Sequence, residues 1–183
     1  VGLLREAGEG SAVTRVLDEI LRAKREEIAL LARTPAARDP AGAEPRGTRV
    51  VSTLLRGRGD ALRLITEIKR RSPSAGPLST ALSVGDRALA YARAGASMIS
   101  VLCDARFFDG GWDHVALARR ALDGAGLAVP ILAKEFVLDE RQIDEAAARG
   151  ADAVLLIVRI VDHARLAVLV GHARAAGLEP LVE

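Results

Sequence analysis

Short apolar runs alternate with longer amphipathic stretches along most of this chain. The runs, which we predict to be β-strands, cover residues 64–68, 97–103, 129–133, 153–158 and 178–183. Four amphipathic stretches between them predict helices at residues 84–94, 112–122, 140–149 and 163–176. The runs start roughly 20–35 residues apart, which is the length of a βα unit. Gly95, Gly150 and Gly177 follow three of these helices, as expected where a helix ends before a strand.

The first sixty residues follow a different pattern. Residues 1–11 predict a flexible leader, and residues 12–33 predict a helix whose apolar positions fall mainly on one face. Residues 34–48 are rich in Pro, Ala, Gly and Arg and predict a loop, after which residues 50–55 predict a short helix. The repeating units then occupy residues 62–183.

The repeated strand–helix order leaves two architectures, an open doubly wound sheet and a (β/α)8 barrel. The strands are almost continuously apolar, which is typical of parallel strands covered by helices. A doubly wound nucleotide-binding fold should carry a glycine-rich turn after its first strand, whereas this chain has KRRSPSAG there. We therefore predict an α/β fold of the (β/α)8 TIM-barrel type over residues 12–183, incomplete with about five βα strands, and with an extra N-terminal helix.

Composition excludes several classes of function. The net charge is only +2 and the basic residues form no long block, so we expect no nucleic-acid partner. The most apolar stretch, residues 153–170, is interrupted by charged residues, so we expect no membrane span. The three histidines are scattered and have no cysteine beside them, so we expect no metal site. A single cysteine, Cys103, and the lack of a signal-peptide pattern favour the cytoplasm.

The lysines are the sharpest compositional signal. Only three of the 26 basic residues are lysines, namely Lys24, Lys69 and Lys134, and a lysine can transfer a proton near neutral pH whereas an arginine cannot. Lys69 and Lys134 both fall at the carboxyl ends of predicted strands, where barrel active sites lie. Strand alternation places Glu67 on the same face as Lys69. Either these residues form a structural ion pair and a surface lysine, or they form a pocket for acid–base chemistry on an anionic substrate.

At these residues the chain resembles the indole-3-glycerol-phosphate synthase family of tryptophan biosynthesis. The resemblance runs from about Val13 to Glu183. The segments that carry it are VLDEILRAKREEIALL, ITEIKRRSPSAG, YARAGASMISVLCDARFFDG, VPILAKEFVLDERQIDEAAARGADAVLLIVRIV and GLEPLVE.

This resemblance implies a lyase that decarboxylates and dehydrates 1-(2-carboxyphenylamino)-1-deoxyribulose 5-phosphate to indole-3-glycerol phosphate, without a metal or organic cofactor. By motif, Lys134 matches the general acid, Lys69 the lysine that contacts the substrate carboxylate, and Glu183 the dehydration glutamate. Glu67 matches a glutamate that orients and tunes its neighbours. The implied substrate-binding residues are Ser72, Phe108, Phe136 and Leu155, with the last three at the anthranilate pocket.

The sequence departs from the family pattern in two ways. Glu135 stands where the family usually has Asp, and Cys103-Asp104 stands where it usually has Thr-Glu. The family also continues with three more strands that carry the phosphate cradle, so we expect this barrel to stop before it closes. Two alternatives remain open. One is a non-catalytic half-barrel whose open edges force dimerisation or aggregation, and the other is a relative of phosphoribosylanthranilate isomerase.

Overall fold

The computed structural model describes residues 6–31, 59, 61–78 and 81–183. The chain divides into two compact units, Val1–Pro35 and Ala36–Glu183, which we describe separately. The predicted loop at 34–48 and short helix at 50–55 lie outside the described residues. No helix in the described part of the chain combines the length and the apolar character that crossing a membrane requires.

The first unit contains the helix α1, Glu6–Leu31. This helix begins inside the segment that we expected to be a leader, while residues 1–5 lie outside the description. The earlier start has a simple cause, since Glu and Ala are strong helix formers and offset the two glycines in this stretch. Within α1, Lys24 Nζ lies 2.6 Å from Glu27 Oε2, an ion pair between successive turns.

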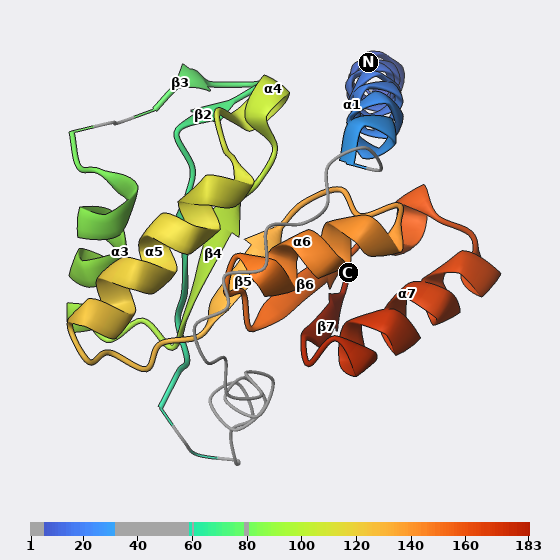
Figure 1. Cartoon of the computed structure of the whole chain (residues 1–183). Coiled ribbons are helices and arrows are strands. Elements are labelled where there is room, and N and C mark those ends of the chain that lie inside the picture. Colours follow the sequence, from blue (N-terminus) through green and yellow to red (C-terminus); the bar gives the residue numbers. More distant parts are fainter. Residues whose placement is uncertain (1–5, 32–58, 60, 79–80) are drawn as a thin grey trace. The chain divides into compact units, whose positions relative to one another are not determined.

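The second unit is a parallel sheet with helices and a small hairpin (Figure 1). The sheet strands are β1 (Ile65–Ile68), β4 (Met98–Leu102), β5 (Ile131–Lys134), β6 (Ala153–Leu156) and β7 (Glu179–Val182). The helices are α3 (Val84–Arg93), α4 (Ala105–Phe108), α5 (Trp112–Gly124), α6 (Glu140–Ala148), the 3-10 helix Val158–Ile160 and α7 (His163–Ala175). The hairpin pairs β2 (Arg71–Ser72) with β3 (Gly76–Pro77).

The strand order distinguishes the two architectures. The order is β1-β4-β5-β6-β7, so each strand lies beside the next one along the chain and every pair is parallel. In a doubly wound sheet the order of the strands reverses at a switch point, whereas the strand order of this sheet does not reverse. The fold is therefore the predicted α/β type, part of a (β/α)8 barrel. Strands and long helices match the predicted segments closely, whereas α4, the hairpin and the 3-10 helix were not predicted.

Alternation along the strands separates two apolar clusters. Residues such as Val101, Ala133 and Val154 point toward the helices and pack with side chains of α3, α5, α6 and α7 in the main core. On the other face, Met98 and Leu155 belong to a smaller cluster with Leu132 and Ala153. The helices thus cover one face of the sheet, and the second face is the one that a barrel turns inward.

A buried ion pair fastens the amino ends of β5 and β6. Asp152 is fully buried, and its Oδ2 accepts hydrogen bonds from the Ile131 backbone N–H at 2.8 Å and from Arg119 Nη1 at 3.2 Å. Arg119 also donates to the Val129 carbonyl at 3.1 Å. One carboxylate therefore fixes the loop before β5 against the start of β6.

We expect Asp152→Ala to destabilise the protein by about 3 kcal/mol or more, because it leaves a buried guanidinium and a buried N–H without this acceptor. Urea unfolding followed by circular dichroism measures the loss. The control is Asp144→Ala, which removes a partly exposed pair with His172 at 2.8 Å and should cost no more than about 1 kcal/mol. Equal losses in the two variants would contradict the assignment.

Candidate active site

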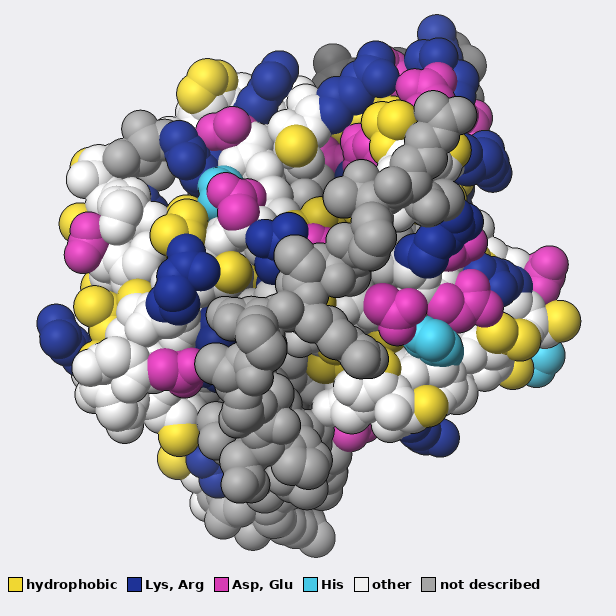
Figure 2. Space-filling view, in the orientation of Figure 1, with side chains coloured by type: hydrophobic (Ala, Val, Ile, Leu, Met, Phe, Trp, Pro, Cys, Tyr) yellow, Lys and Arg dark blue, Asp and Glu magenta, His cyan; other side chains and the backbone are white. Residues whose placement is uncertain are grey.

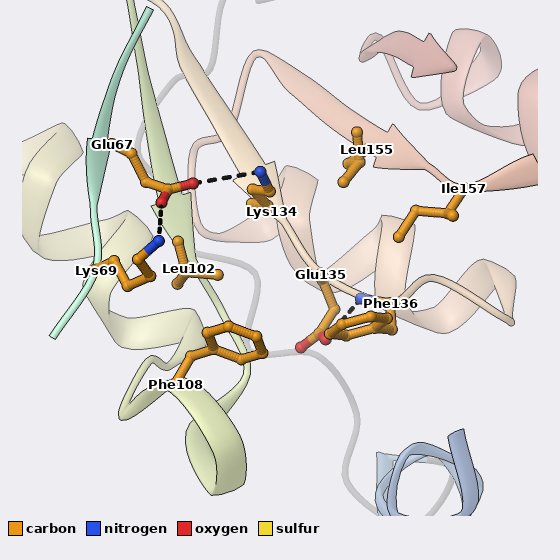
Figure 3. A pocket seen from close by; sticks show the side chains of 9 residues that line it. All are labelled: Glu67, Lys69, Leu102, Phe108, Lys134, Glu135, Phe136, Leu155 and Ile157. Carbon is orange, nitrogen blue, oxygen red and sulfur yellow. Dashed lines mark hydrogen bonds and ion pairs between the residues drawn. The ribbon is translucent and has the colours of Figure 1, made fainter. Parts of the chain in front are cut away.

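A pocket of about 230 Å3 lies at the carboxyl ends of β1, β4, β5 and β6. Figure 3 shows the side chains that line it, which are Glu67, Lys69, Leu102, Phe108, Lys134, Glu135, Phe136, Leu155 and Ile157. This is the end of the sheet at which barrel enzymes place their chemistry. The structure therefore brings together six of the eight residues that the sequence analysis singled out.

One carboxylate joins the two lysines of the pocket. Glu67 Oε1 lies 2.7 Å from Lys69 Nζ, and Glu67 Oε2 lies 3.3 Å from Lys134 Nζ. Ile68 between the first two is buried among the helices, so the predicted alternation is confirmed. These three side chains, the ionic group, bridge β1 and β5 across β4 and together carry one formal positive charge in excess. An anionic ligand would therefore meet two ammonium groups here, whereas the carboxylate of Glu135 leaves the whole lining without a net formal charge.

The environment shifts the pKa of Glu67. Partial burial raises this pKa, but the hydrogen bond from Lys69 and the positive charges of Lys134 and Lys69 lower it by more, so that the net pKa is below its ordinary value. Glu67 is therefore ionised at neutral pH and holds both ammonium groups in place.

Two aromatic rings form another wall of the pocket. The ring centroids of Phe108 and Phe136 lie 6.2 Å apart, with the planes tilted by 33°. In Figure 3 these rings lie below the ionic group, with Leu155 and Ile157 on the right. Tilted rings at this separation are a favourable aromatic pairing, and they offer an apolar surface to a flat ligand. The pocket is thus ionic on one side and apolar on another.

The loop after β4 is built to hold Phe108. Asp104 is fully buried, and its Oδ1 accepts the backbone N–H groups of Phe107 at 2.6 Å and Phe108 at 3.3 Å, which starts the short helix α4. Gly110 then packs against the strand, where an added Cβ would lie 2.3 Å from the Leu102 carbonyl oxygen. Arg70 Nε lies 3.1 Å from Asp109 Oδ2 and links this loop to the residue after Lys69.

Two of the sequence-predicted residues do not line the pocket. Ser72 is nearly buried in the β2–β3 hairpin, where its Oγ accepts the Ala75 N–H at 3.0 Å. Glu183 follows β7 at the same carboxyl end of the sheet, and its backbone forms hydrogen bonds with Leu156 and Val158. Their assigned roles stay predictions.

Sequence reasoning missed three lining residues, Leu102, Glu135 and Ile157. Alternation could have found Leu102, since it shares a face with Met98. Glu135 is different, because it follows Lys134 directly and a continued strand would turn it toward the helices. The strand ends at Lys134, and Glu135 Oε1 accepts the Phe136 N–H at 2.7 Å, which keeps this buried carboxylate beside the pocket.

Among the described residues, the charges on the face seen in Figure 2 do not gather at a second centre. In Figure 2, acidic and basic side chains lie interspersed over the parts of the visible face that are not grey. No group of three or more His, Cys, Asp or Glu side chains that could hold a metal ion occurs among the described residues.

A sequentially ordered parallel sheet with charged and aromatic side chains at its carboxyl end defines a protein of the (β/α)8-barrel class. Comparison with known proteins gives the family. The family model described as indole-3-glycerol phosphate synthase matches residues 17–183. The chain therefore belongs to the indole-3-glycerol phosphate synthase family, and not to the isomerase alternative.

Individual relatives agree. The chain is 42% identical over 182 residues to indole-3-glycerol phosphate synthase 2 of Streptomyces coelicolor, which covers 100% of the chain and 62% of that relative. It is 40% identical over 168 residues to indole-3-glycerol phosphate synthase of Exiguobacterium sibiricum, covering 92% of the chain and 61% of the relative. A multifunctional tryptophan biosynthesis protein of Phanerodontia chrysosporium is 47% identical over 120 residues, which is 66% of the chain and 15% of that protein. The chain thus spans less than two thirds of each of these relatives.

Glu67 should stabilise the protein less as the solution becomes acidic. Its folded-state pKa is below its ordinary value of 4.5, so its stabilising effect is complete above the unfolded-state pKa and is lost as the pH falls through the folded-state pKa. We expect the difference in free energy of unfolding between wild type and Glu67→Gln to shrink as the pH falls from the unfolded-state pKa of Glu67 through its folded-state pKa. Urea unfolding at a series of pH values measures it, and a difference that does not vary with pH would refute the idea.

Gly110→Ala should displace the loop that carries Phe108, because backbone oxygens occupy the space of the new Cβ. We expect a loss of about 1–3 kcal/mol in the free energy of unfolding and a change in the environment of Phe108. The matched control is Gly124→Ala in α5, where an added Cβ meets nothing within 4 Å. Thermal unfolding of both variants tests this, and an equally stable Gly110→Ala protein would show that the loop adapts freely.

Proposed function

We propose that this protein catalyses the reaction of its family, the closure of 1-(2-carboxyphenylamino)-1-deoxyribulose 5-phosphate to indole-3-glycerol phosphate with loss of carbon dioxide and water. The observation that carries the proposal is the pocket, in which Glu67 lies between two lysines next to a pair of phenylalanine rings. The pocket has an ionic side and an apolar side, and the substrate is divided in the same way, since it joins a flat benzoate ring to a polar, phosphorylated chain.

Lys134 is the proposed general acid. Ring closure develops negative charge on the carbonyl oxygen of the substrate, and an ammonium group can protonate this oxygen as the new carbon–carbon bond forms. Lys134 ends β5 with its side chain partly exposed in the pocket, so a ligand can reach its Nζ. Glu67 holds this ammonium from one side and leaves its remaining donors for the ligand.

Lys69 is the proposed partner of the substrate carboxylate and assists later proton transfer. It comes from the end of β1, and its Nζ lies close to Glu67. Loss of carbon dioxide restores the aromatic ring, and loss of the hydroxyl group as water then requires a proton donor. We assign the dehydration step to Glu183, which follows β7 at the carboxyl end of the sheet, with Lys69 as the second acid–base group.

The apolar wall supplies the binding surface for the benzoate ring. Phe108, Phe136 and Leu155 line it from three different segments, which allows the ring to be enclosed from several sides. Ser72 is proposed to hold the substrate from the loop after β1. This chemistry needs only acid–base side chains, and we place it in the cytoplasm, where a phosphorylated intermediate and the single reduced cysteine would both be found.

Lys134→Ala should lower the turnover number by about 100-fold or more, since it removes the proposed general acid. Lys134→Arg is the matched control for charge, because it keeps a cation that cannot release a proton near neutral pH. We expect both variants to lose turnover to this extent and only the arginine variant to retain substrate affinity. The indole fluorescence of the product measures turnover, and an active alanine variant would remove the assignment.

A second candidate is a non-catalytic chain that self-associates through its sheet edges. One observation favours it: within the described residues β1 and β7 each have a single neighbouring strand, and Val182 in β7 exposes 47% of its surface. Unpaired strand edges readily pair with other chains. Sedimentation of the same preparation separates the candidates, because an inactive oligomer supports the second and an active monomer excludes it.

A further inference from the structure

A buried amide connects the helix behind the pocket to one of its aromatic walls. Gln142 lies in the first turn of α6 and exposes only 2% of its surface. Its Oε1 accepts the backbone N–H groups of Leu138 at 2.7 Å and Asp139 at 3.2 Å. Its Nε2 donates to the backbone carbonyl of Phe136 at 3.0 Å. All three partners belong to the loop between β5 and α6.

Capping of the helix explains only part of this arrangement. In a capping box the side chain three residues into the helix accepts the N–H of the cap residue, and Gln142 Oε1 does this for Asp139. A glutamate would serve equally well for that purpose, because only an acceptor is needed. The bond from Nε2 to Phe136 requires a donor and reaches six residues back along the chain, beyond the helix end.

The loop that Gln142 holds is short and carries pocket residues. Phe136 is the second residue after β5, and its ring packs against Phe108 on the other side of the pocket. Phe136 has its N–H bonded to Glu135 and its carbonyl bonded to Gln142, so both backbone polar groups of this residue are held by side chains. Fixing the backbone on both sides of a Cα fixes the direction in which the ring leaves the chain.

We propose that Gln142 is a positioning residue, which uses its amide N–H to hold the Phe136 ring as a wall of the pocket and so sets the affinity for an aromatic carboxylate. It acts through Phe136 and touches no ligand itself. The positioning role stands on the described contacts, and only the class of ligand rests on the proposed function.

Two substitutions separate positioning from capping. Gln142→Glu keeps an oxygen acceptor for Leu138 and Asp139 but turns a second oxygen toward the Phe136 carbonyl, which removes that hydrogen bond and adds repulsion. Asp139→Ala does the reverse, because it removes the side chain that accepts the Arg141 N–H and leaves the Gln142–Phe136 bond in place. If the glutamate variant does not fold, Gln142→Asn serves instead, since its amide is one methylene too short to reach both ends of the loop.

The first readout needs no ligand. The chain has three phenylalanines, so full-length protein labelled with 4-fluorophenylalanine gives three fluorine NMR signals, with the Phe136 and Phe108 signals assigned by their loss in Phe136→Leu and Phe108→Leu. We expect Gln142→Glu to shift and broaden the Phe136 signal and also to shift the Phe108 signal. Asp139→Ala should leave both in place. A folded Gln142→Glu protein with unchanged Phe136 and Phe108 signals would overturn the inference.

The second readout is the affinity for 2-aminobenzoate, titrated into the same samples. We expect Gln142→Glu to bind 2-aminobenzoate about tenfold more weakly, because a tenfold change in affinity corresponds to the free energy that roughly one hydrogen bond contributes. We expect unchanged binding in Asp139→Ala. Wild-type protein that binds no 2-aminobenzoate would count against the proposed function alone, because the NMR result still decides the positioning role. Equal affinity in wild type and Gln142→Glu would overturn the link between this residue and the ligand.

Discussion

The site depends on one carboxylate that pairs with two ammonium groups, one from the end of its own strand and one from a strand that it does not touch. Glu67 belongs to β1 and Lys134 to β5, and β4 lies between them. This bridge is possible only because the strands are parallel and in register, since Leu102 pairs with Lys134 and Glu67 pairs with Ser100 one level below. A slip of one residue in either pairing would turn one partner toward the helices. The buried apolar alternation that fixes the register therefore also assembles the ionic group.

Much of this could be predicted from the sequence because it follows from periodicity. Alternation put Glu67 and Lys69 on one face, and the apolar run before Lys134 placed it at a strand end. The glycines after three helices marked the turns correctly, and Gly150 and Gly177 have the positive φ values of 88° and 78° that such turns need. These features are local, and local patterns are what a single sequence records well.

The parts that could not be predicted depend on contacts between loops. Glu135 faces the pocket because the strand ends one residue before it, and no periodic pattern marks that end. The pattern Asp139-x-x-Gln142 indicates a helix start, yet nothing in it tells that the amide also reaches back to Phe136. The start of α1 was also missed, since residues 1–11 were expected to form a leader and the helix begins at Glu6.

The two phenylalanine walls show a common way of building a pocket on loops. Loops are the mobile parts of a barrel, and a binding surface needs side chains that keep one direction. Phe108 follows a fully buried Asp104 that binds its N–H, and Phe136 precedes a buried Gln142 that binds its carbonyl. Each wall is thus fixed by a polar side chain that is itself withdrawn from solvent, where a hydrogen bond has no competition from water. The ionic group gains its position differently, from the strands, so the chemistry and the binding surface of this pocket rest on separate supports.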